Sequence, residues 1–236
     1  MSSGAQTTEY EWKGRTGPFK LLVGPGVFVP THTSAALAQA LEVKPDHTVV
    51  DVGCGTGVLS FVAARLGACR VIGCDISKES VEIARRNAER LGHTEVTEFR
   101  LGNMLEPVHD EEADIIIGDI SGIPNDVAEL TGWFPGGPTG AELPVAMLEN
   151  VGDTLKRGGH LYLPTGTIQA EETVLEAARR IFGPRMEVIL EREFPVSSIV
   201  ARSSAVMELV SKGVVKLRQR GSRLLWRLQI WRCERD

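Results

Sequence analysis

The stretch VVDVGCGTGVLS, residues 49–60, passes from a run of β-branched residues through a glycine-rich turn to an apolar helical pattern. It predicts a strand over 48–52 and a helix that starts after the last glycine. Glycines at the turn let the backbone adopt conformations that other residues avoid, and let a ligand approach it closely. The stretch therefore predicts a strand–turn–helix unit with a ligand at the turn.

Alternation of predicted strands and helices continues through most of the chain. Further strands are predicted over 70–75, 95–101, 113–118 and 160–164, and helices over 77–92, 141–159 and 168–183. Such alternation specifies an α/β fold with a mostly parallel sheet and helices on both faces. After Pro184 the pattern changes to two long strands, 186–193 and 223–232, with a helix over 206–218 between them. We expect these strands to close the sheet as an antiparallel pair.

The composition fits an ordinary soluble globular protein, with 42% hydrophobic and 24% charged residues among 236. We expect one domain over 27–236, preceded by a partly mobile N-terminal extension over 1–26. No apolar run reaches transmembrane length, and the first residues lack the apolar core of a signal peptide. The four cysteines form no metal-ligand spacing, so we expect no metal, free thiols and a cytoplasmic protein.

Charge is distributed unevenly along the chain. The net charge is −5, yet the residues from Lys212 onward contain eight Lys or Arg and two acids. This basic C-terminal segment is either a docking surface for RNA or an acidic protein, or a solvated strand face.

Two acids near the turn narrow the choice of ligand. Asp75 ends the second strand, 20 residues beyond Gly55, where a carboxylate can accept both hydroxyls of a ribose. The Gly-x-Gly-x-Gly spacing differs from the Gly-x-Gly-x-x-Gly that cradles a pyrophosphate. Asp51, two residues before Gly53, would repel a diphosphate but suits a cofactor that carries an amine. On the residues alone, a nicotinamide cofactor or a purely structural turn stays open.

The motif DVGCGTG at 51–57 resembles the first motif of class I S-adenosylmethionine-dependent methyltransferases residue for residue, and the resemblance covers residues 27–232. It implies a Rossmann-like seven-stranded sheet with an antiparallel last strand, and S-adenosylmethionine as cofactor. It also implies that the turn contacts the methionine part, that the second-strand acid holds the ribose, and that LGNML at 101–105 lies near the adenine. The cofactor-binding residues expected on this basis are Asp51, Gly53, Cys54, Gly55, Gly57, Asp75, Ile76, Asn103, Met104 and Asp119.

Three blocks are similar to the release-factor glutamine methyltransferase branch of that family. They are the entry segment at 27–41, DIIIGDISGIP at 114–124, and FPGGPTGAE at 134–142. The second block aligns with the branch's Asn-Pro-Pro-Tyr motif, but Asp119 replaces the Asn and Gly122 replaces the Tyr. Because an ionised Asp only accepts hydrogen bonds and Gly offers no ring, a glutamine side chain or an adenine ring would lose its partners.

Asp119 is the first candidate catalytic residue, because it ends a buried apolar strand at the expected ligand edge. It would hold an ammonium or hydroxyl, or take its proton; the alternative is a helix cap. His32 is the second candidate, as a base, and a surface or capping role is its alternative. Phe28, Thr31, Ser121 and Trp133 are expected to contact substrate, although Trp133 and its neighbour Phe134 would equally pack on the sheet edge.

These observations predict a methyltransferase that acts on a nitrogen or oxygen of a small molecule. The alternative is methylation of a protein side chain or RNA, with the basic C-terminal segment as docking surface. Two other classes stay open: a nicotinamide-dependent oxidoreductase and a cofactor-binding module without activity. No membrane association is expected, and oligomeric state is not predicted.

Overall fold

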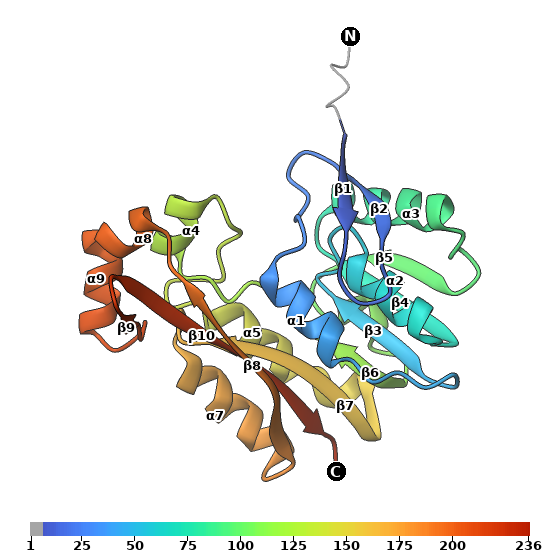
Figure 1. Cartoon of the computed structure of the whole chain (residues 1–236). Helices are drawn as coiled ribbons and strands as arrows, with labels where there is room; N and C mark the ends of the chain where they lie inside the picture. Colours follow the sequence, from blue (N-terminus) through green and yellow to red (C-terminus); the bar gives the residue numbers. More distant parts are fainter. Residues whose placement is uncertain (1–6) are drawn as a thin grey trace. The chain divides into compact units, whose positions relative to one another are not determined.

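The computed structural model describes residues 7–236 and divides into two compact units, which are described one at a time (Figure 1). The first unit comprises Met1–Asp119 and Asp153–Tyr162, and the second comprises Ile120–Gly152 and Leu163–Asp236. The first six residues of the expected mobile extension lie outside the described residues.

Parallel strands form the sheet of the first unit. They are β3 (Thr48–Val52), β4 (Arg70–Asp75), β5 (Thr97–Leu101), β6 (Ala113–Ile117) and the first part of β7 (Leu155–Gly166), in the order β5-β4-β3-β6-β7. In the register, Asp51 of β3 lies beside Gly73 on one side and Ile117 on the other. The carboxyl ends of β3, β4 and β6 therefore meet at one edge, where open α/β sheets bind their ligands.

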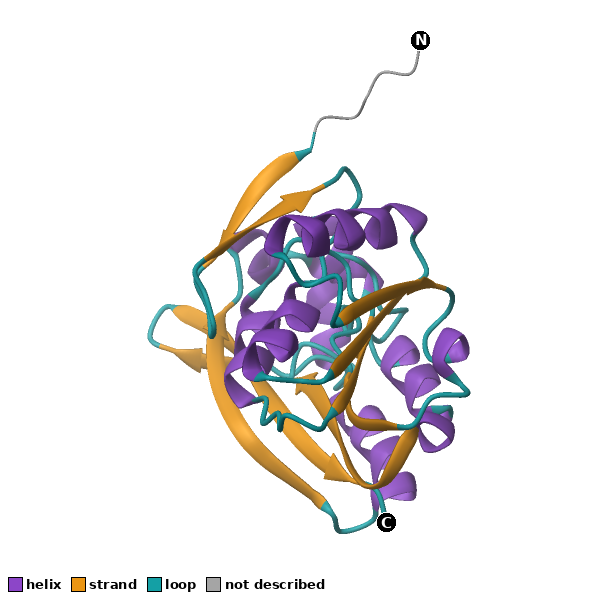
Figure 2. Cartoon of the chain, turned by 90° about the vertical axis from the view of Figure 1, so that its right-hand side faces the viewer, coloured by secondary structure: helices purple, strands orange, loops and turns teal. Residues whose placement is uncertain are grey.

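Helix α3 (Lys78–Leu91) of the first unit begins and ends at the predicted signals. Figure 2 shows helices packed against strands; α2 (Val58–Leu66) and α3 pack on β3, β4 and β5, and α1 (His32–Ala40) packs on α2. The hydroxyl of Ser77 accepts the N–H of Ser80 at the start of α3, and Gly92 ends that helix with φ +69°. Both boundaries confirm the prediction from the sequence.

An N-terminal hairpin, for which the sequence predicted no structure, joins the first unit. Strand β1 (Thr8–Trp12) pairs with β2 (Phe19–Val23) in antiparallel register. The buried amide of Asn87 on α3 accepts the N–H of Leu22 across 2.7 Å and donates to the carbonyls of Leu22 and Thr56, each across 3.0 Å. Asn87 thereby ties the hairpin and the glycine turn to the same helix.

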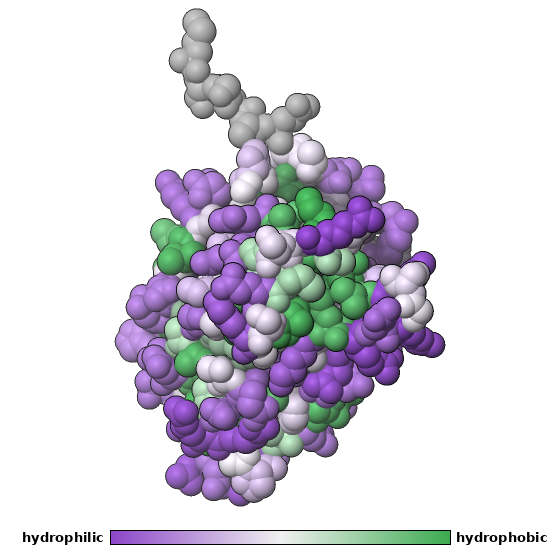
Figure 3. All heavy atoms as spheres, turned by 90° about the vertical axis from the view of Figure 1, so that its left-hand side faces the viewer, coloured by the Kyte–Doolittle hydropathy of each residue, from purple (hydrophilic) through white to green (hydrophobic). Residues whose placement is uncertain are grey.

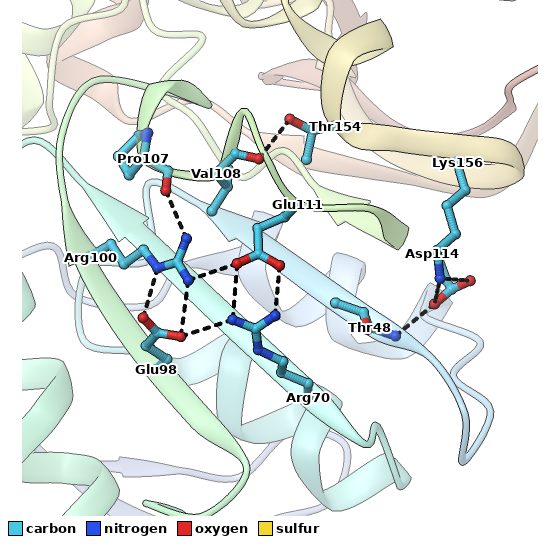
Figure 4. Close-up of polar contacts among 10 residues, drawn as sticks. All are labelled: Thr48, Arg70, Glu98, Arg100, Pro107, Val108, Glu111, Asp114, Thr154 and Lys156. Atoms are coloured by element: carbon cyan, nitrogen blue, oxygen red, sulfur yellow. Dashed lines mark hydrogen bonds and ion pairs between the residues drawn. The ribbon is translucent and has the colours of Figure 1, made fainter.

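An ion-pair network stabilises the edge of the first unit's sheet (Figure 4). Glu111 receives hydrogen bonds from Arg70 across 2.6 and 2.9 Å and from Arg100 across 2.7 Å. Glu98 pairs with the same two arginines. These contacts hold the pKa of Glu111 and Glu98 below the usual range, so both carboxylates are ionised at neutral pH.

The second unit contains the antiparallel strands. The order β7-β10-β8 combines the last part of β7 with β8 (Met186–Pro195) and β10 (Arg223–Glu234), and β9 (Arg218–Arg220) also pairs with β10. The antiparallel register of β8 and β10 confirms the predicted pair. Its helices are α4 (Asn125–Thr131), α5 (Glu142–Glu149), the start of α6 (Val151–Thr154), α7 (Glu171–Phe182), α8 (Ser198–Arg202) and α9 (Ser204–Ser211). The α/β fold with a mostly parallel sheet and antiparallel C-terminal strands is confirmed.

Two predicted helices end earlier than expected. The helix expected over 141–159 is divided into α5, which ends at Glu149, and the short α6, which stops at Thr154. Leu155 then pairs with Ala113, and a register shift absorbs the extra residues before His160. The helix expected over 206–218 stops at Ser211, where Gly213 takes φ +74° and the β-branched pair Val214–Val215 follows.

The basic C-terminal segment is partly neutralised within the second unit. Arg218 pairs with Glu193 across 2.7 Å, Arg227 pairs with Glu171 across 3.0 Å, and Arg232 pairs with Glu187. Lys212 pairs with Glu208 across 2.6 Å. At least four of the segment's eight basic residues thus have a carboxylate partner, which weakens its field for a polyanion.

Figure 3 shows one face of the surface, on which hydrophilic residues predominate and hydrophobic residues lie between them. Within residues 7–236, the structure contains no helix with the length and apolar character needed to cross a membrane.

Candidate functional site

The glycine turn wraps the end of β4. The N–H groups of Gly53 and Cys54 both donate to the carbonyl of Cys74, across 2.8 and 2.9 Å. Gly57 takes φ +81°, and a Cβ at this position would lie 2.8 Å from the ring of Phe61. The turn therefore requires glycine both for its backbone conformation and for helix packing. Cys54 and Cys74 are buried, and burial raises the pKa of both thiols, that of Cys74 to about 12, so they are neutral.

Asp51 precedes this turn, and one of its carboxylate oxygens has no hydrogen-bond partner among the residues that the structure describes. Its side chain is 1% exposed, Oδ2 accepts a hydrogen bond from the Ser60 hydroxyl across 2.6 Å, and Oδ1 is buried without a partner. Burial, together with the charges of Asp119 and Asp75, raises the pKa of Asp51 to about 7. An unsatisfied buried acceptor next to a glycine cradle fits a ligand that brings an ammonium group.

Asp75 uses both carboxylate oxygens to fix the turn. Oδ2 accepts the N–H of Gly55 across 2.9 Å, and Oδ1 accepts the N–H of Ser77 across 2.8 Å. Each oxygen retains a lone pair for a ribose hydroxyl. Ile76, the next residue, is 73% exposed, so its side chain is available to a flat ring.

The residues expected near the adenine lie on the loop after β5. Asn103 is exposed, and its amide donates to Glu106 across 3.4 Å. Met104 is half-buried and takes φ +48°, a conformation that residues other than glycine rarely adopt.

The entry segment reaches the glycine turn through Phe28. A Cβ on Gly55 would lie 3.4 Å from the Cβ of Phe28, in ordinary van der Waals contact. Thr31 is the N-cap of α1, and its hydroxyl accepts the N–H of Thr33. His32 is exposed as the first residue of that helix. Thr31 thus has a structural role in addition to the substrate contact expected of it.

Asp119 follows β6 and is held by α1. The Ser34 hydroxyl donates to Asp119 Oδ2 across 2.7 Å, and the Asp119 side chain is half-buried. Burial raises the pKa of Asp119 to about 6, against the opposing hydrogen bond from Ser34. The structure thus brings Asp51, Asp75 and Asp119 close enough for the charges of Asp75 and Asp119 to act on Asp51.

In the second unit, Gly122 makes room for a buried amide. A Cβ on Gly122 would lie 1.8 Å from Oε1 of Gln169, whose side chain is 5% exposed and whose Nε2 is buried without a partner. The hydroxyl of Ser121 donates to the carbonyl of Phe134. Trp133 and Phe134 are both exposed, at 41% and 47%. Ser121 therefore supports the aromatic loop, and the exposed rings agree better with a surface position than with core packing.

The sequence did not predict the contacts of Ser34 and Ser60 in the first unit, nor the buried amide of Gln169 in the second unit. The spacing Thr31-x-x-Ser34 is a capping-box signal and identifies Ser34 as a helix-start residue, although not as the partner of Asp119. Nothing local indicates Ser60 or Gln169, because their roles depend on tertiary packing.

A family profile described as a methyltransferase domain matches residues 43–216. The chain is 27% identical over 186 residues to a ribosomal protein L11 methyltransferase of Syntrophomonas wolfei, covering 77% of this chain and 54% of that protein. It is 30% identical over 175 residues to the protein of the same name from Bacillus cereus, covering 74% of this chain and 49% of that protein. The chain thus spans about half the length of these curated relatives.

Solved structures share the fold. The 16S rRNA N2 G1207 methyltransferase of T. thermophilus, in complex with AdoMet and guanosine, aligns with a TM-score of 0.62 at 17% identity, covering 98% of this chain and 51% of that one. The comparisons support the S-adenosylmethionine-dependent class. The relatives are named for ribosomal protein L11, so they do not support the finer resemblance to the release-factor branch.

Proposed function

The chain belongs to the methyltransferase domain family and uses S-adenosylmethionine, and from this premise we propose that it methylates an amino group of a protein. The names of the curated relatives favour a protein acceptor over the small molecule expected first from the sequence. Because the chain spans about half of those relatives, their substrate is a guide to the class of acceptor only.

Charge favours a protein over RNA as the acceptor. Non-specific RNA binding depends on unpaired Lys and Arg. In the basic C-terminal segment, Arg218, Arg227 and Arg232 are paired with glutamates of the same unit. Lys216, Arg220 and Arg223 are exposed, which leaves a modest positive surface for an acidic protein segment.

The carboxylate of Asp119 is the observation that carries the proposal. It stands at the carboxyl end of β6 and, when ionised, can only accept hydrogen bonds. An ammonium supplies donors and a positive charge, whereas a primary amide would need a donor in return. With its pKa raised to about 6, Asp119 is ionised at neutral pH. It can therefore hold an ammonium by charge and hydrogen bonds, and it is the group placed to accept the proton that the amine loses before methyl transfer.

Three features of the first unit fit the cofactor. Asp51 Oδ1 would accept from the amino group, the glycine turn would lie along the methionine part, and Asp75 would accept from the ribose hydroxyls. The bound cofactor supplies an activated methyl group. The protein therefore has to position the acceptor nitrogen, remove its proton and exclude water.

Labelling with tritiated S-adenosylmethionine in extract of the source cell tests the class of acceptor. The proposal predicts acid-precipitable label that protease releases and ribonuclease does not. Label in the small-molecule fraction would instead support the first expectation from the sequence. Label that ribonuclease releases, with activity that falls steeply with salt, would support RNA.

A further inference from the structure

The buried hydroxyl of Ser34 joins two parts of the candidate site that are far apart in the sequence. It donates to Asp119 Oδ2 across 2.7 Å and accepts the backbone N–H of Thr31 across 3.3 Å. We propose that Ser34 is a positioning residue that couples the loop over the glycine turn, residues 27–31, to Asp119. The proposal rests on the function proposed above for Asp119. It goes beyond that function because it links Asp119, on the acceptor side of the site, to the glycine turn, on the cofactor side.

The direction of the two hydrogen bonds follows from the chemistry of the groups. A serine hydroxyl has one proton, and the N–H of Thr31 can only donate. The Ser34 oxygen accepts that N–H, and its own proton is donated to Asp119 Oδ2. This arrangement favours the ionised carboxylate, in agreement with the lowering effect of Ser34 on the pKa of Asp119.

The loop 27–31 is anchored at both ends. At its start, Val27 is buried in a cluster with Leu22, Val23 and Ile83. At its end, Thr31 caps α1 and bonds to Ser34. Between the anchors, Phe28 lies against Gly55 of the glycine turn. A change at the Ser34 anchor therefore reaches the cofactor side through Phe28.

Other titratable groups also belong to the elements around Asp119. Asp51 lies one residue before the end of β3, and the charge of Asp119 raises its pKa. Asp75 ends β4, and its charge also raises the pKa of Asp51. On α1 itself, His32 is exposed at the N-terminus. Asp51 is the group whose titration overlaps that of Asp119, so an experiment on pH must resolve the two carboxylates.

A double-mutant cycle tests the coupling without any acceptor. Binding of S-adenosylhomocysteine is measured by calorimetry for the wild type, Ser34→Ala, Asp119→Asn and the double variant. We expect each single variant to bind about fivefold to tenfold more weakly, the scale of one lost hydrogen bond to a charged group, and the double variant to bind no more weakly than either. Wild-type affinity in Ser34→Ala, or losses that multiply in the double variant, would overturn the proposal.

The carboxyl ¹³C signal of Asp119 gives a second readout, one that a merely weakened helix would not move. We expect Ser34→Ala to titrate Asp119 at higher pH than the wild type; an unchanged titration would contradict the link. Ser203→Ala removes another serine hydroxyl that accepts a backbone N–H at the start of a helix, that of Val206 in α9, and is the matched control, with unchanged affinity and titration expected. If Ser34→Ala does not fold, Ser34→Cys keeps the size with a weaker donor, and an intermediate shift is expected. These binding and titration experiments use no methyl acceptor. Their failure would therefore contradict the role of Ser34, whereas failure of the labelling experiment would contradict the proposed function.

Discussion

The Ser60 hydroxyl donates to Asp51 Oδ2 across 2.6 Å, while Asp51 Oδ1 is buried without a partner. Asp51 is therefore half satisfied by the protein itself. The free oxygen lies next to the glycine turn, and burial raises the pKa of the group to about 7. A cationic amine would supply the missing hydrogen bond to Oδ1 and would offset the cost of ionising the buried carboxyl.

Proton release on cofactor binding follows from this arrangement. An ammonium placed against Asp51 lowers the pKa of its carboxyl, so binding of S-adenosylhomocysteine should release a proton near pH 6.5 and none near pH 8.5. Calorimetry in buffers of different ionisation enthalpy measures this release. Asp51→Asn should abolish it and weaken binding roughly 10- to 100-fold, as expected for a lost charged hydrogen bond. Equal release in Asp51→Asn would assign the proton to another group.

The contribution of Asp51 to the stability of the cofactor-free protein should fall as pH rises from about 4 to about 7. Asp51 has an ordinary pKa of 3.8 and a folded pKa of about 7, so over this range the unfolded state loses its proton while the folded state keeps it. Deprotonation therefore favours unfolding, with a slope of up to about 1.4 kcal/mol per pH unit. Asp51→Asn removes this slope. Urea unfolding at pH 5 and pH 7 should therefore show that the stability of the variant, relative to the wild type, increases with pH. A difference that does not depend on pH would contradict the raised pKa.

Asp119→Ala should separate chemistry from cofactor binding. Loss of the carboxylate should lower turnover by about 10²- to 10⁴-fold, the usual contribution of a general base. Binding of S-adenosylhomocysteine should stay within about tenfold of the wild type, which is the loss that the Ser34 contact accounts for. Single-turnover kinetics and calorimetry on the same preparation make the comparison. Unchanged turnover would exclude Asp119 from the reaction.

Gly122→Ala should destabilise the second unit. The added Cβ would lie 1.8 Å from Oε1 of Gln169, and the buried amide would have to move. Overpacking of this kind costs about 1–3 kcal/mol. Gly152→Ala is the matched control, because a Cβ there meets nothing within 4 Å. Thermal unfolding that showed equal losses for both variants would contradict the close contact.

The sequence was sufficient where structure depends on local signals. The strand–turn–helix unit at 48–66, the Ser77 cap and the acids at the strand ends all follow from spacing and residue type. The partners of those acids could not be predicted, because Ser34 and Asp119 meet only after folding.

The carboxylate partners of the basic C-terminal segment could not be predicted for the same reason. Glu187 lies opposite Arg232 in the antiparallel register of β8 and β10. A count along the chain therefore shows an excess of positive charge that strand pairing partly cancels.

The chemical form of the methylated product tests the central claim most directly. Protein labelled from tritiated S-adenosylmethionine is hydrolysed in strong acid, and the labelled compounds are separated. If Asp119 receives an ammonium, the label should survive hydrolysis and co-elute with N-methylated amino acids. Label released as methylamine would indicate a side-chain amide acceptor, and label released as methanol by mild base would indicate a carboxyl ester; either result would contradict the account.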